Sequence, residues 1–123
     1  MPPRRHDAPT DREAEILAIL WEKGETDVEG IRAGLTDRPT ANTVRTLLGI
    51  MLERGLVADD GRAYGRKYRA LVPRAQIQCS ALRRLVDTLF AGSAAEVVLR
   101  LVDEGEVDAE QLQKLQKRLK DKN

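Results

Sequence analysis

Apolar residues recur at helical spacing three times within the first 55 positions of the chain. The stripes predict helices over about residues 10–23, 28–35 and 40–54, because apolar positions at i, i+3, i+4 and i+7 share one helix face. The stripes consist of Ile16, Leu17, Leu20 and Trp21, then Val28, Ile31 and Leu35, then Val44, Leu47, Leu48 and Met51.

Polar residues and glycines mark the ends of these helices. Thr10–Glu13 and Thr26–Glu29 have the spacing of a capping box, in which a hydroxyl and a carboxylate each accept an otherwise unpaired amide. Thr40 can cap the third helix. Gly24 and Gly55 follow the first and third helices, where glycine readily adopts the left-handed conformation that ends a helix.

A short hairpin is predicted after the third helix. Leu56–Ala58 forms one strand, Asp59–Arg62 the turn, and residues 63–71 contain the return strand. We expect Tyr68 to pack in the core and Tyr64 to be exposed. The order of three helices and two strands predicts a mainly α fold with a small β-hairpin, the winged helix-turn-helix.

Three further helices are predicted after Pro73, which suits the first turn of a helix. This tail, residues 73–123, is too short for a stable core of its own, and its first helix has a broad apolar face. We expect the tail to dimerise, since two-fold dimers are the commonest oligomers; folding back on its own chain is the alternative. The predicted interface residues are Ile77, Leu82, Leu85, Val86, Leu89, Phe90, Val98 and Leu101.

The sequence thus predicts two domains. Residues 1–72 form a winged helix whose first nine residues are flexible, and residues 73–123 form a helical dimerisation domain. Inside the tail, Ser93–Glu96 is a third capping-box sequence, and Asp108 can cap the last helix.

Composition excludes several classes of function. The chain has 123 residues, with one cysteine, Cys79, and one histidine, His6, which lies in the flexible start. This composition offers neither a disulfide framework nor a set of metal ligands, and no catalytic constellation or glycine-rich phosphate loop is present. We therefore expect no enzyme, no metal and no cofactor. Cys79 is expected to be a small buried hydrophobe.

No long apolar run is present, so the sequence predicts no membrane insertion and a cytoplasmic protein. The net charge is only +1, but it is unevenly distributed. Residues 7–37 hold nine acidic and three basic residues, whereas residues 38–75 hold eight basic and three acidic residues. Such an arrangement can direct one face toward phosphate; a solvated mixed surface is the alternative.

The third helix has short polar side chains at its N-terminal end, where a helix in the major groove approaches base edges. The hairpin adds basic residues that can lie along the phosphate backbone. Winged helices also serve as protein-interaction modules, and a redox sensor acting through Cys79 is a further alternative. The candidate DNA-binding residues are Thr40, Asn42, Thr43, Arg45 and Thr46 in the helix, and Arg62, Arg66 and Lys67 in the wing.

Over residues 10–120 the sequence resembles the penicillinase-repressor family of bacterial transcriptional regulators. The resemblance is carried by TDREAEILAILWEKG, TANTVRTLLGIMLERGLV, DGRAY and LVDTLFAGSAAEVVLRLVDEGEVDAEQLQKLQKRL. It implies a homodimer that represses transcription at a palindromic DNA operator, often near a gene for a membrane-embedded metallopeptidase sensor. It also implies that Thr40, Asn42, Thr43 and Thr46 read the operator, with Arg45 near phosphate.

The sequence departs from the family pattern in places. Asn42 stands where relatives often have Lys, Ile50 where they can have Arg, and the wing is slightly longer than usual. Antibiotic-responsive members are cleaved at an Asn-Phe pair in the tail, where this chain has Arg100 and Leu101. Copper-responsive members have a C-terminal cysteine cluster, which the tail KLQKRLKDKN lacks, so the sequence disfavours copper sensing.

Overall fold

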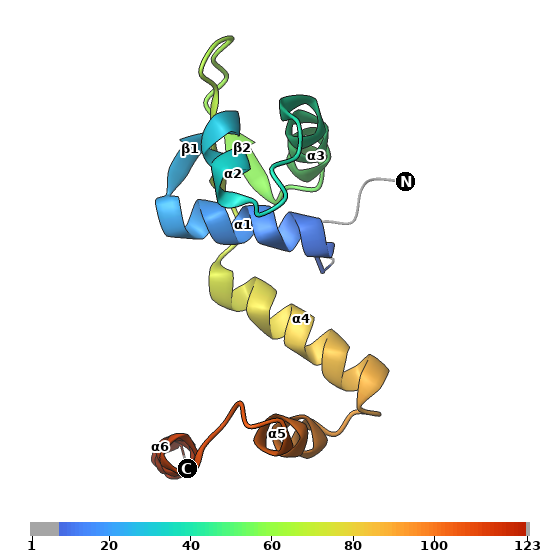
Figure 1. Cartoon of the computed structure of the whole chain (residues 1–123), viewed down its shortest axis with the longest axis vertical. Coiled ribbons are helices and arrows are strands. Elements are labelled where there is room, and N and C mark those ends of the chain that lie inside the picture. The colour runs from blue at the N-terminus through green and yellow to red at the C-terminus, as the bar shows by residue number, and fades with distance from the viewer. Residues whose placement is uncertain (1–7, 123) are drawn as a thin grey trace. The chain divides into compact units, whose positions relative to one another are not determined.

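A computed structural model describes residues 8–122 of the chain. The predicted mainly α fold with a small antiparallel sheet is confirmed (Figure 1). Residues 1–7 of the predicted flexible start, including His6, lie outside the described residues. The elements are α1 (Asp11–Lys23), β1 (Glu25–Asp27), α2 (Val28–Gly34), α3 (Ala41–Glu53), β2 (Val57–Asp59), β3 (Lys67–Ala70), α4 (Arg74–Leu89), α5 (Ala94–Asp103) and α6 (Ala109–Lys122).

Contacts group the chain into two compact units that divide inside α4. The N-terminal unit runs to Leu82 and holds α1 to β3 with the first half of α4, and the C-terminal unit begins at Arg83. The functional division into a DNA-binding segment, residues 1–72, and a dimerising segment, residues 73–123, stays a prediction.

The caps of α1 and α3 are as the sequence predicts. The Oγ1 atom of Thr10 accepts the amide of Glu13 at 3.2 Å, and the Glu13 carboxylate accepts the amide of Thr10 at 2.9 Å. Thr40 caps α3 through the amide of Thr43. Gly24 ends α1 with a φ of 83°, a conformation that glycine adopts readily because it has no Cβ atom.

The predicted capping box at Thr26–Glu29 is wrong. The N-cap of α2 is Asp27, whose Oδ1 atom accepts the amide of Gly30 at 2.9 Å. Thr26 lies in β1, where it pairs with Tyr68 of β3, so it is part of the sheet and not the cap. The Glu29 carboxylate pairs with Arg32.

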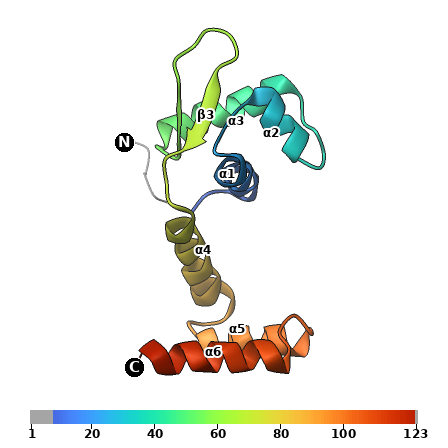
Figure 2. The same ribbon diagram turned by 90° about the vertical axis from the view of Figure 1, so that its left-hand side faces the viewer.

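The sheet has three strands in the order β1-β3-β2, all antiparallel, and β1 was not predicted from sequence. The predicted turn at Asp59–Arg62 is too short, because β2 ends at Asp59 and β3 begins at Lys67. The amide of Asp60 donates to the Lys67 carbonyl at 3.1 Å, which closes the loop at its base. The wing is therefore β2, β3 and a seven-residue loop, residues 60–66, which extends beyond α1, α2 and α3 (Figure 2).

One apolar core holds the N-terminal unit together. Tyr68 belongs to it with 6% of its surface exposed, whereas Tyr64 is 92% exposed, as predicted for both. A Cβ atom on Gly34 would lie 2.8 Å from the Cδ1 atom of Ile19, so glycine allows α2 to approach α1 closely. The core residues are Ile16, Leu17, Ile19, Leu20, Ile31, Leu35, Val44, Leu48, Met51, Leu56, Val57, Tyr68, Val72 and Ile77.

The start of α4 is fixed to α1 within this unit. The indole Nε1 of Trp21 donates to the carbonyl of Val72 at 3.0 Å, and the Arg74 guanidinium lies 5.6 Å from the centre of the Trp21 ring. Ile77 follows one turn later and is only 4% exposed. Ile77, predicted to lie in the dimer interface, thus packs in the core of its own chain.

The prediction that Cys79 is buried is wrong, since Cys79 is exposed. Two positions along a helix correspond to a rotation of about 200°. Because Ile77 points into the core, Cys79 points away from it.

In the C-terminal unit, side chains cap α5 and α6, but the two helices bury little of their apolar surface. Asp108 and Gln111 each accept the amide of the other, at 2.8 and 2.9 Å, so the predicted cap of α6 is a complete capping box. The Ser93 hydroxyl caps α5, while its amide donates to the carbonyl of Phe90 rather than to Glu96. Among the described residues of α5 and α6, none is buried.

Candidate nucleic-acid interface

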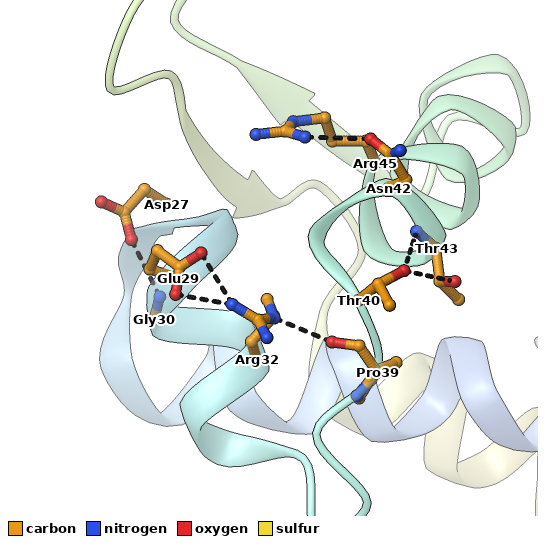
Figure 3. A network of polar contacts seen from close by, with 9 residues as sticks. All are labelled: Asp27, Glu29, Gly30, Arg32, Pro39, Thr40, Asn42, Thr43 and Arg45. Carbon is orange, nitrogen blue, oxygen red and sulfur yellow. Dashed lines mark hydrogen bonds and ion pairs between the residues drawn. The ribbon is translucent and has the colours of Figure 1, made fainter.

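Arg32 of α2 positions the start of α3. Its Nη1 atom lies 2.9 Å from both carboxylate oxygens of Glu29, which fixes the guanidinium on the surface of α2. Its Nε atom donates to the carbonyl of Pro39 at 2.8 Å, directly before the N-cap of α3 (Figure 3). The turn between the helices also contains Arg38 at a φ of 42°, a conformation uncommon for a residue with a Cβ atom.

Two threonines form the first polar pair on α3. The Oγ1 atom of Thr40 accepts the amide of Thr43 at 3.2 Å, and the two hydroxyl oxygens lie 3.0 Å apart (Figure 3). Both side chains are exposed. The first turn of α3 contains no acidic residue, so its N-terminal dipole is not neutralised by a neighbouring carboxylate on the same turn.

Asn42, Arg45 and Thr46 form the second polar group, and all three are exposed. Arg45 donates through Nη1 to the Oδ1 atom of Asn42 at 3.2 Å (Figure 3). The Thr46 hydroxyl donates to the Asn42 carbonyl at 3.0 Å. The five helix residues predicted from sequence therefore lie together on the exposed N-terminal turns of α3.

The wing carries the other predicted residues. Arg62, Arg66 and Lys67 are all exposed. The sequence prediction missed that two carboxylates stand among them: Arg66 Nη1 lies 3.6 Å from Asp59, and Arg62 Nε lies 3.6 Å from Asp60. The Asp-Asp-Gly sequence of the predicted turn was the available signal, because Asp side chains often bond loop amides.

The pKa of Asp60 lies below its usual value. Partial desolvation in the loop raises this pKa, but the amides of Arg62 and Lys67, the positive charge of Arg62 and the amide of Asp60 itself together lower it by more. The carboxylate therefore stays ionised at neutral pH.

A hollow of about 400 Å³ lies between the start of α2, α3 and the wing. Arg45 of α3 and Arg66 of the wing both line it. Asp27 and Glu29 at the start of α2 line it as well, which gives it carboxylates beside the two guanidinium groups. Of the wing residues predicted to bind DNA, Arg62 and Lys67 are not among its lining.

The penicillinase repressor family matches residues 9–121, nearly the whole chain. The chain belongs to the penicillinase repressor family. No curated protein matches it. Membership implies a transcriptional repressor, and the members of this family are regulators rather than enzymes.

In this penicillinase repressor, side-chain contacts hold the C-terminal end of α3 as well as its start. Arg54, the C-cap residue of α3, donates through Nη1 to the buried carboxylate of Glu13 in α1, and through Nη2 to the carbonyl of Ala8 at 3.4 Å. The helix is thereby tied to α1 at one end and, through Arg32, to α2 at the other.

Within residues 8–122, no group of three or more His, Cys, Asp or Glu side chains is arranged to hold a metal ion. None of the helices in that range has the length and apolar character needed to cross a bilayer.

Proposed function

We propose that this chain represses transcription by binding a palindromic DNA operator as a homodimer. The observation that carries the proposal is the hollow shared by Arg45 of α3 and Arg66 of the wing, next to the exposed polar turns of α3. A helix in the major groove with a wing on the adjacent backbone needs base-reading groups on the helix and cations at the junction.

The α3 side chains suit base edges. An Asn amide can pair in a bidentate manner with adenine, and a Thr hydroxyl can donate or accept. In the free protein, the side-chain oxygen Oδ1 of Asn42 already accepts a hydrogen bond from Arg45. A phosphate that draws Arg45 away would free Asn42 for a base, which links a backbone contact to a base contact.

The proposed dimer rests on the tail. Large apolar side chains of α4 and α5 are exposed, Leu89 most of all at 74%. A second copy is the occupant that fits, since a helical regulator that reads a palindrome must match its two-fold symmetry. The proposed interface consists of Leu82, Leu85, Val86, Leu89, Phe90, Val98 and Leu101, without Ile77.

If α3 contacts the bases, removing one of these contacts should weaken binding to the operator more than binding to random DNA. Asn42→Ala and Thr43→Ala should each weaken operator binding by roughly 1–3 kcal/mol, while binding to random DNA changes little. Gel-shift titration against the DNA upstream of the chain's own gene, and against random DNA of equal length, measures both.

Thr36→Ala is the matched control, because Thr36 is an exposed threonine in the turn before α3. It should leave the preference for operator unchanged. Equal losses on both DNAs in the Asn42 and Thr43 variants would place these side chains on the phosphate backbone and not on the bases.

A further inference from the structure

Each arginine in the wing loop faces a carboxylate of the wing itself. Arg66 Nη1 lies 3.6 Å from Asp59 Oδ2, and Arg62 Nε lies 3.6 Å from Asp60 Oδ2. Arg66 also donates through Nε to the carbonyl of Arg62 at 2.7 Å, which holds the two arginines near each other. The two arginines of the wing loop are thus already paired in the free protein.

The carboxylates are held more firmly than the arginines. The amide of Gly61 donates to Asp59 Oδ1 at 3.0 Å, and the amides of Arg62 and Lys67 donate to Asp60 Oδ1 at 3.2 and 3.3 Å. Each carboxylate therefore uses one oxygen to shape the loop and presents the other to an arginine.

Exposure agrees with this difference. The side chains of Asp59 and Asp60 are 21% and 24% exposed, whereas those of Arg66 and Arg62 are 42% and 70% exposed. When DNA approaches, the arginines can move to phosphate, but the aspartates stay in the loop.

We propose that Asp59 and Asp60 are specificity-determining residues, which keep the wing arginines from binding phosphate until α3 has docked on its operator. This inference rests on the proposed function. On random DNA, binding depends almost wholly on phosphate contacts, and a loosely placed wing must compete with its own aspartates for each arginine. On the operator, base contacts by α3 hold the wing next to the DNA phosphates. Each arginine can then leave its aspartate for a phosphate that lies close by.

The test uses Asp59→Asn in the full chain, because the Asn side chain keeps an oxygen for the amide of Gly61 and removes only the charge. We expect affinity for random DNA to rise several-fold and affinity for the operator to rise less, so that the ratio of the two falls. The salt dependence on random DNA should steepen by about 0.9 per protomer for each phosphate that an arginine gains.

Glu22→Gln is the control for net charge. Glu22 is an exposed carboxylate on α1, which lies well away from the wing loop in both views (Figures 1 and 2). Glu22→Gln changes the charge of the chain by the same amount and should leave the ratio of operator affinity to random-DNA affinity unchanged. An equal rise on both DNAs with Asp59→Asn, or no rise on either, would overturn the inference.

Arg66→Ala separates this inference from the proposed function. Wild-type protein that does not prefer its operator contradicts the proposed function itself. A second outcome contradicts only the wing inference. In it, the wild-type protein prefers the operator, and the Arg66→Ala variant binds both DNAs as tightly as the wild type does and with the same salt dependence.

Discussion

Glu13 shows how one residue can serve both a local and a distant part of the fold. Its carboxylate closes the capping box of α1 through the amide of Thr10 and also pairs with Arg54 at the end of α3. The Glu13 residue is only 3% exposed, which is unusual for a carboxylate without a charged partner. The hydrogen-bonded pair makes this burial possible and ties α1 to the end of α3.

Removing the charge of Glu13 should therefore cost stability. Glu13→Gln keeps an acceptor for the Thr10 amide but removes the buried charge that pairs with Arg54, and we expect the free energy of unfolding to fall by roughly 1.5–3 kcal/mol. Urea denaturation followed by circular dichroism measures the change. Glu15→Gln is the control, because Glu15 forms a half-exposed pair with Arg12 at 3.6 Å, and it should cost less than about 1 kcal/mol. Equal losses would show that burial of Glu13 adds nothing.

The sequence could predict residues whose partners are close along the chain. Thr10, Thr40 and Asp108 are predicted as caps from the sequence around each helix start, and the structure confirms all three, whereas the Thr26–Glu29 box is wrong because Thr26 pairs in the sheet. It could not predict the partner of Glu13, because Arg54 is 41 positions away. The pairing of wing arginines with Asp59 and Asp60 was missed for another reason: it depends on the path of a loop that was predicted too short.

At the scale of elements, α4 is the helix whose pattern was least informative. Periodicity correctly predicts a broad apolar face, but it does not say what covers that face. In the structure Ile77 packs in the core of the N-terminal unit, while Leu82, Leu85 and Leu89 are exposed. The strand β1 was missed because its three residues, Glu25–Asp27, are polar and form a strand only by pairing with β3.

The two parts of α4 should respond differently when a large apolar side chain is replaced by alanine. Ile77→Ala should lower the free energy of unfolding of the N-terminal unit by roughly 2–5 kcal/mol, because it leaves a cavity in a packed core. Leu82→Ala, at a position 53% exposed, is the matched control and should cost this unit much less. Chemical denaturation at several protein concentrations separates folding from association. A stable Ile77→Ala protein that dissociates would instead place Ile77 in the interface.

The whole molecule combines a small net charge with two regions of opposite charge, and the basic region contains α3 and the wing. One winged helix makes few contacts, and its sequence-independent binding is weak, with a Kd of about 10⁻⁴ to 10⁻⁶ M at physiological salt. Two copies held together turn the second docking into an intramolecular step. Their recognition helices would then read half-sites about one helical turn, or a multiple of it, apart.

Loss of the dimer should therefore abolish useful affinity without unfolding the chain. Leu89 is 74% exposed, so Leu89→Asp should fold normally as a single copy, yet it places an unpaired carboxylate in the proposed interface. We expect the variant to sediment as a monomer and to lose most of its operator affinity. Thr88→Asp adds the same charge one position earlier on an exposed residue and should stay dimeric. A dimeric Leu89→Asp protein with wild-type affinity would place the interface elsewhere.

Trp21 is the one tryptophan of the chain, and it lies where the first turn of α4 joins α1. Its indole N–H is bonded to Val72 and its ring is covered by Arg74, so its fluorescence comes from a single, defined environment. If this junction opens, the indole meets more water and its emission moves to longer wavelength. The unlabelled protein therefore contains its own optical probe of that junction, which can be followed during titration with DNA or dilution of the proposed dimer.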